Sequence, residues 1–117
     1  MKFSVRTVEK TVVFDLKGGL EGGPESVKVR DAVLERLEKG ERKFILNLDK
    51  VAFVNSTGIG IITAIYTSIT NAGGRMKISN ANEKVSRVMM VTRLLGVFDS
   101  YYHENDALKA FNAEDTA

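Results

Sequence analysis

Residues 44–60 of the chain read FILNLDKVAFVNSTGIG, a strand pattern, a polar break and the start of a helix pattern in succession. The first part, FILNL at 44–48, is a nearly continuous apolar run, which is typical of a strand buried on both faces of a sheet. Apolar residues at 51–54 lead to the polar segment 55–58, and apolar residues then recur at helical spacing as far as Ile69. The stretch therefore predicts a central strand, a short loop and a helix.

Strand and helix patterns continue to alternate on both sides of this stretch. Alternating and β-branched residues near the N-terminus predict a hairpin, and helix-start residues before apolar residues at helical spacing predict further helices. The predicted elements are strands at 3–8, 11–16, 44–48 and 76–79, helices at 24–40, 55–72, 80–92 and 106–111, and a short strand or turn after residue 98. The sequence thus predicts an α/β fold, a single domain with a mixed, mostly parallel sheet and the order β-β-α-β-α-β-α-(β)-α.

A glycine-rich segment separates the hairpin from the first helix. Residues 18–24 hold four glycines and the only proline of the chain, which predicts a loop that ends in the first helical turn at Pro24. Loops that follow parallel strands gather at the carboxyl ends of those strands, so we expect this loop and the loop after Phe53 to lie side by side. The domain is expected to span residues 1–112, and residues 113–117 are expected to form a disordered tail.

The composition is that of an ordinary globular domain, with 44% hydrophobic and 27% charged residues. The formal net charge is only +2 and basic residues are interleaved with acidic ones, so the sequence predicts no direct binding of nucleic acid. The absence of cysteine excludes disulfides and thiolate metal sites and suits a cytoplasmic location. The chain opens without a leader pattern, and no apolar run approaches the roughly 20 residues that cross a bilayer, so we expect no membrane insertion.

The sequence offers no convincing catalytic or metal-binding arrangement. His103 is the only histidine and lies in a polar stretch, so we interpret it as an exposed loop residue and exclude a site with several histidines. Ser56, His103 and Asp99 or Asp106 could be imagined as a triad, but the G-x-S-x-G elbow is missing. The glycines at 18–23 lack the lysine and the spacing of a phosphate-binding loop. We therefore predict no enzyme activity, no metal and no cofactor, and a chain that acts by binding another protein.

Residues 53–60 join the buried strand to the next helix and are the candidate site. Asn55 or Ser56 can cap this helix, because either side chain can accept hydrogen bonds from N–H groups of the first turn. Gly58 and Gly60 remove bulk and let another surface approach closely. Free N–H groups and the helix dipole also favour a phosphate at this end. The residues alone leave two interpretations of Ser56 open, a simple helix cap or a phosphate acceptor.

The segment 47–60 resembles the signature of STAS domains, the family named for sulfate transporters and anti-sigma-factor antagonists. In the bacterial antagonists a buried strand and a short loop lead to Asp-Ser-Ser/Thr-Gly-Leu-Gly, which opens a helix. Ser56 matches the serine that is phosphorylated in this family, and Thr57, Gly58 and Gly60 match directly. The resemblance therefore favours Ser56 as a phosphate acceptor.

The resemblance extends over roughly residues 3–111. GGLE at 18–21 is similar to the Gly-x-Leu-Asp loop of the family, with Glu21 at the acidic position, and RLLGVF at 93–98 is similar to the end of its third helix. The chain departs from the family at Asn55, where the antagonists carry Asp. Asn55 can still cap a helix and removes a negative charge beside an incoming phosphate, whereas an Asp could align the serine hydroxyl in a kinase. The sequence leaves open which of these effects is larger.

The resemblance implies an anti-sigma-factor antagonist. In that scheme the unphosphorylated domain binds an anti-sigma factor with serine kinase activity and releases a sigma factor, phosphorylation of Ser56 ends the binding, and a phosphatase resets the switch. ATP and Mg²⁺ then belong to the partner. Two alternatives within the family remain, a STAS scaffold in a larger signalling assembly and a subunit that regulates a membrane transporter of lipids or anions without phosphorylation. The residues expected to contact the partner are Glu21, Asn55, Ser56, Thr57, Gly58 and Gly60.

Overall fold

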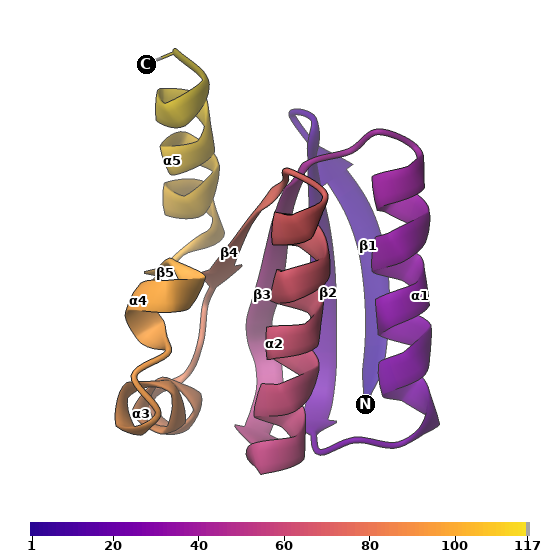
Figure 1. Cartoon of the computed structure of the whole chain (residues 1–117). Helices are drawn as coiled ribbons and strands as arrows, with labels where there is room; N and C mark the ends of the chain where they lie inside the picture. The colour runs from indigo at the N-terminus through magenta and orange to yellow at the C-terminus, as the bar shows by residue number, and fades with distance from the viewer. Residues whose placement is uncertain (117) are drawn as a thin grey trace.

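The computed structural model describes residues 1–116, which form one mixed sheet flanked by helices (Figure 1). Within these residues the strand order is β1-β2-β3-β4-β5, with β1 antiparallel to β2 and the other neighbouring pairs parallel. The elements are β1 (Lys2–Val8), β2 (Thr11–Leu20), α1 (Pro24–Glu38), β3 (Lys43–Val54), α2 (Ser56–Asn71), β4 (Arg75–Ser79), α3 (Glu83–Val91), α4 (Leu95–Phe98), β5 (Ser100–Tyr101) and α5 (Glu104–Thr116). The predicted fold class and order of elements are confirmed, with the short helix α4 added before β5.

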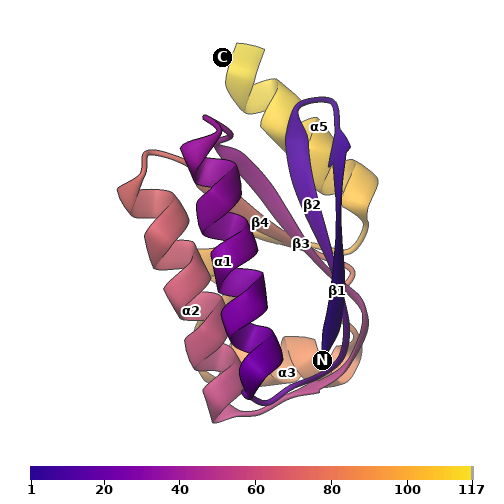
Figure 2. The same ribbon diagram turned by 90° about the vertical axis from the view of Figure 1, so that its right-hand side faces the viewer.

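The helices form two unequal layers, one on each face of the sheet (Figure 2). Helices α1, α2 and α3 bury apolar residues against one face, where Phe14 and Phe44 are fully buried. Helix α5 packs on the other face, where Phe111 joins Val13 and Ile45 in a second, smaller cluster. Strand β3 is therefore covered on both faces, as its nearly continuous apolar sequence predicts.

Strand β2 runs further than the sequence indicates. It continues through two glycines to Leu20, so the predicted loop at 18–24 is wrong and only residues 21–23 connect β2 to α1. The ring of Phe53 on β3 lies over Gly19, where a Cβ atom would come within 2.5 Å of the ring. Pairing with β3, with a register shift between the two glycines, keeps them in the sheet despite their weak strand preference.

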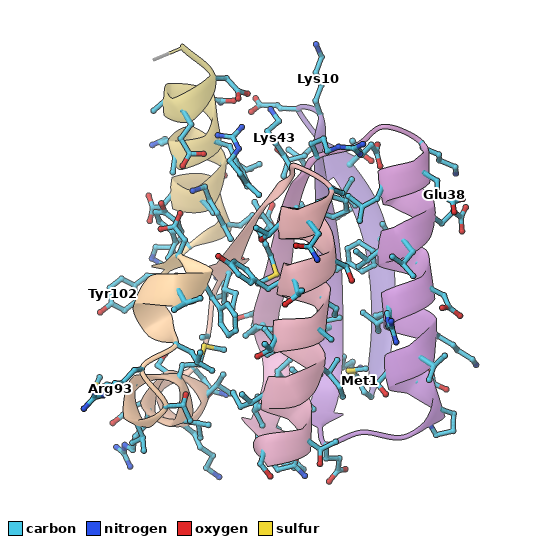
Figure 3. All side chains as sticks on the ribbon, viewed as in Figure 1. Met1, Lys10, Glu38, Lys43, Arg93 and Tyr102 are labelled. Carbon is cyan, nitrogen blue, oxygen red and sulfur yellow. The ribbon has the colours of Figure 1, made fainter. Side chains whose placement is uncertain are left out.

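Helix α5 continues to Thr116, so its end is helical rather than disordered. The predicted disordered tail at 113–117 is therefore wrong over its described part, and Ala117 lies outside the described residues. The end of the helix is held by charge, since the Nζ atom of Lys43 on β3, which is labelled in Figure 3, lies 2.7 Å from a carboxylate oxygen of Asp115. A local polar sequence gives no sign of such a contact, because the basic partner lies far away along the chain.

A buried lysine adds a second attachment of α5 to the sheet. Lys77 on β4 is 2% exposed, and its Nζ donates hydrogen bonds to Asp99 and, at 2.8 Å, to Glu114 of α5. The same Nζ lies 4.7 Å from the centre of the Phe111 ring. Burial alone would lower the pKa of Lys77, but the hydrogen bonds to the two carboxylates raise the pKa above its usual value. Lys77 is thus charged at neutral pH and ties α5 to β4.

Helix α3 is capped by Asn82 and begins at Glu83, three residues after the predicted start at residue 80. The side-chain oxygen of Asn82 accepts the Val85 N–H at 2.8 Å, and its NH₂ group donates to the Val51 carbonyl oxygen at 2.8 Å. Asn80 instead adopts a left-handed backbone conformation, with φ of 60°, directly after β4. The Asn82 cap therefore also fastens α3 to β3.

Candidate functional site

The carboxyl ends of β2 and β3 lie side by side and carry the two loops of the candidate site (Figure 1). Leu20 pairs with Val54 across the parallel ladder, and the Asn55 N–H donates to the Leu20 carbonyl oxygen at 3.2 Å. Gly22 has φ of 101° and lies so close to Thr57 that a Cβ atom would come within 2.9 Å of its methyl group. The β2–α1 connection therefore lies beside the start of α2 as expected, although it comprises only residues 21–23 and not the predicted loop at 18–24.

Asn55, and not Ser56, caps helix α2. The Asn55 side-chain oxygen accepts the Gly58 N–H at 2.9 Å, and the Asn55 backbone is extended, with φ of −101°. Ser56 is the first residue of the helix and its side chain is exposed. Its hydroxyl makes no hydrogen bond to any residue in the described part of the chain. The cap is thus supplied by Asn55, and the Ser56 hydroxyl is exposed to solvent.

This cap leads to a prediction for Asn55. Asn55→Ala should lower the free energy of unfolding by about 1 kcal/mol, because the Gly58 N–H loses its acceptor. Asn55→Asp should keep the free energy of unfolding within about 0.5 kcal/mol of the parent, since a carboxylate also accepts this bond and suits the positive end of the helix dipole. Urea denaturation followed by circular dichroism measures both changes. Equal stability of Asn55→Ala and the parent would contradict the cap.

The two glycines of the segment differ in what surrounds them. Gly58 is buried, and a Cβ atom there would lie 1.9 Å from the carbonyl oxygen of Leu20. The close approach that Gly58 permits is therefore to its own chain, and its burial does not fit the direct partner contact expected from the sequence. Gly60 is exposed, and a Cβ atom there would meet no atom of the fold within 4 Å.

The other residues expected to contact a partner are exposed. Glu21 lies in the short β2–α1 loop, while Asn55, Ser56, Thr57 and Gly60 follow β3. The structure thus brings the acidic residue of the first loop to the same end of the sheet as the start of α2. We call this set of five exposed residues the Ser56 surface.

The structure assembles neither a hydrolytic triad nor a metal site from its described residues. Ser56 makes no hydrogen bond to His103, which is itself exposed, and residues 1–116 hold no group of three histidine, aspartate or glutamate residues that could hold a metal ion. Over the same residues, no helix is both long enough and apolar enough to cross a membrane. Among the described residues, the reactive group that the Ser56 surface offers is the exposed Ser56 hydroxyl, which makes no hydrogen bond to them.

Two features beside the Ser56 surface were not predicted from the sequence. A hollow of about 250 Å³ lies between the N-terminal turns of α1 and α2, with Val27 and Arg30 on one side and Thr57 on the other. Phe53 is 38% exposed near the end of β3. A signal for Val27 exists in the sequence, because it stands two positions before the buried Val29 and so falls off the apolar face of α1.

The model of the STAS domain family matches residues 2–107, and the chain therefore belongs to the STAS domain family. This match covers every strand of the sheet and the helices that position the Ser56 surface. The resemblance found in the sequence is thus confirmed at the level of the family.

Individual relatives agree with this family. A Thermotoga maritima protein named as a candidate anti-sigma factor antagonist is 35% identical over 75 residues, which cover 64% of this chain and 66% of that protein, just under two thirds of its length. A solved structure of a candidate anti-sigma factor antagonist from Thermotoga maritima has a TM-score of 0.79 at 26% identity and covers 92% of each chain.

The anti-sigma factor antagonist SpoIIAA in its unphosphorylated form is similar in fold, with a TM-score of 0.78 at 22% identity over 96% of this chain and 97% of that one. The phosphorylated form of SpoIIAA, from Bacillus, has a TM-score of 0.72 at 20% identity over 94% of this chain and 99% of that one. At these identities the likeness to SpoIIAA shows the fold alone.

Proposed function

We propose that the chain is an anti-sigma-factor antagonist. Its unphosphorylated form binds an anti-sigma factor with serine kinase activity and releases a sigma factor, and phosphorylation of Ser56 ends that binding. The main support is the state of Ser56, whose hydroxyl is exposed and free of hydrogen bonds to described residues because Asn55 supplies the helix cap. The names of the relatives, and the existence of SpoIIAA in a phosphorylated and an unphosphorylated form, also support this function.

The partner docks on the Ser56 surface in this proposal. Glu21 has no ion pair among the described residues, so its carboxylate can pair with a basic residue of the partner. Ser56 and Thr57 lie beside it at the start of α2, where the backbone is already ordered by the Asn55 cap. A pre-ordered surface of this kind loses little conformational entropy on binding.

Phosphorylation then acts through charge. The kinase transfers the γ-phosphoryl group of its own ATP to the Ser56 Oγ, the hydroxyl proton passes to a base of the kinase, and ADP leaves. The modified side chain carries about −1.5 to −2 charges at neutral pH. Because Ser56 lies within the docking surface, this charge would have to be desolvated on binding, which weakens the complex. A phosphatase that removes the phosphate restores binding. Because the proposed partners are cytoplasmic, the proposal also includes a cytoplasmic location for the chain.

The purified anti-sigma kinase encoded in the same genome tests the proposal. Isothermal titration calorimetry without ATP should show binding of the parent chain, and the purified phosphorylated chain should bind at least about tenfold more weakly. Fragment-ion mass spectrometry should place the phosphate on Ser56. Glu21→Lys should weaken the binding of the unphosphorylated chain by at least about 1 kcal/mol, because the charge that faces the partner is reversed.

Lys109→Glu, a charge reversal of the same size and opposite sign at a distant position, is the control for Glu21→Lys. Lys109 is exposed on α5, which packs on the opposite face of the sheet from α1 and α2, so this variant should bind like the parent. A parent chain that binds none of the anti-sigma kinases of its genome would contradict the proposed function. Equal affinity of the phosphorylated and unphosphorylated chains would contradict the switch.

A further inference from the structure

The hollow between α1 and α2 opens next to the Ser56 surface. The two helices lie side by side on the sheet (Figure 2), and the hollow lies between their N-terminal turns. Thr57, the residue after Ser56, forms part of its wall, so the hollow and the Ser56 surface are continuous. The residues that line it are Ser26, Val27, Arg30, Thr57, Gly60, Ile61 and Ala64.

Gly60 lines this hollow and has no explanation within the fold. It lies inside the long helix α2, where glycine is less favourable than alanine because it loses more backbone entropy on folding. Its backbone does not have a positive φ, and a Cβ atom there would meet no atom of the fold within 4 Å. In contrast, Gly58 is required by the close approach of Leu20. The space above Gly60 is therefore not filled by any described residue.

Val27 and Arg30 give this space its chemical character. Val27 is 59% exposed although it is an apolar residue, and it lies off the buried face of α1. Arg30 is exposed and has no ion-pair partner among the described residues, whereas the nearby Lys28 is paired with Glu25. The hollow thus combines an apolar wall with an unneutralised cation at its edge.

The size of the hollow limits what it can receive. Its volume of about 250 Å³ lies below the range of roughly 300–1,000 Å³ that is usual for pockets that bind small molecules. It can hold an apolar side chain of a protein partner, and the charge of Arg30 favours a segment with an acidic residue beside that side chain.

We propose that this hollow is a specificity pocket for the anti-sigma partner, in which an apolar side chain of the partner lies over Gly60 and against Val27 while a carboxylate of the same segment pairs with Arg30. The proposal rests on the proposed function. It separates two roles on one surface, since the hollow selects which anti-sigma factor is bound and the phosphorylation state of Ser56 determines when it is bound.

The test uses three single variants of the full chain and the same purified anti-sigma kinase. Gly60→Ala adds a methyl group inside the hollow, Val27→Ala shortens its apolar wall, and Arg30→Glu reverses the charge. Each should raise the dissociation constant at least about fivefold in calorimetric titration. Gly60→Ala and Val27→Ala should also unfold at the same or a higher urea concentration than the parent, because alanine is the better helix former at both positions. Weaker binding together with equal or greater stability cannot arise from damage to the fold.

Two controls are matched to these changes. The first control is Thr67→Ala, at a position on α2 about two turns after Gly60, which also raises helix propensity. The second control is Lys109→Glu, which makes the same change of charge as Arg30→Glu but on α5. Both should bind the kinase like the parent. If the parent binds and all three test variants bind equally well, the specificity pocket is wrong and the proposed function stands. If the parent binds none of the anti-sigma kinases of its genome, both proposals are overturned.

Discussion

A chain with alanine in place of Ser56 should take up no phosphate from the anti-sigma kinase and should remain bound to it in the presence of ATP. The substitution removes the acceptor oxygen and breaks no hydrogen bond of the described structure. The cap is unaffected, because the Gly58 N–H is held by Asn55. The free energy of unfolding should therefore stay within about 0.5 kcal/mol of the parent, as for other surface changes.

The measurement is incorporation of labelled phosphate from ATP, with the parent chain and Thr57→Val run beside Ser56→Ala. Thr57→Val keeps the shape of its side chain and removes the only other hydroxyl in the first turn of α2. Because Thr57 belongs to the docking surface, Thr57→Val can be labelled more slowly than the parent, but it should still carry its phosphate on Ser56, whereas Ser56→Ala should not be labelled at all. Undiminished labelling of Ser56→Ala would show that another hydroxyl group accepts the phosphate, with Thr57 as the first candidate.

The fold was predictable because its strand and helix patterns are local. The apolar run at 44–48 predicts a strand covered on both faces, and β3 is indeed packed between α5 and the helices of the opposite face. The helix after Asn55 begins where a capping residue precedes apolar residues at helical spacing. Patterns of this kind involve only residues that are close together in the chain, so they can be recognised in a single sequence.

The two incorrect predictions, the loop at 18–24 and the disordered tail at 113–117, concern segments whose structure depends on distant residues. The extension of β2 to Leu20 depends on pairing with β3 and on the ring of Phe53 over Gly19, and no local pattern in a glycine-rich segment shows that pairing. The helical end of α5 likewise depends on ion pairs between its acidic residues and basic residues of the sheet, such as Lys43 with Asp115. In both places a long-range contact outweighs the local preference of the sequence.

The candidate site was predictable in position and only partly in detail. Helix-capping rules place Ser56 at the start of α2, but they allow Asn55 or Ser56 to be the cap, and only the hydrogen bond from Gly58 to Asn55 decides between them. The sequence interpretation treats Gly58 and Gly60 alike, as positions that let another surface approach closely. Their difference comes from Leu20 on β2, which approaches Gly58 and not Gly60.

Gly58→Ala should lower the free energy of unfolding by at least about 3 kcal/mol, the largest loss expected from one added methyl group in this chain. The new Cβ atom would lie 1.9 Å from the carbonyl oxygen and 2.7 Å from the carbonyl carbon of Leu20. This obstacle is backbone rather than a flexible side chain, and it is fixed by the pairing of Leu20 with Val54. Relief would require α2 to move off β2, which would also break the hydrogen bond from the Asn55 N–H to Leu20.

Gly60→Ala provides the matched comparison, with the same added methyl group two positions further along the same helix. It should raise the free energy of unfolding by about 0.5–1 kcal/mol, because the methyl group meets open space and alanine is the better helix former. Urea denaturation of both variants, followed by far-ultraviolet circular dichroism, measures the two changes. Effects of opposite sign are expected only if α2 packs on β2 through Gly58. Equal effects at the two positions would contradict that packing, and with it the placement of Ser56 beside the β2–α1 loop.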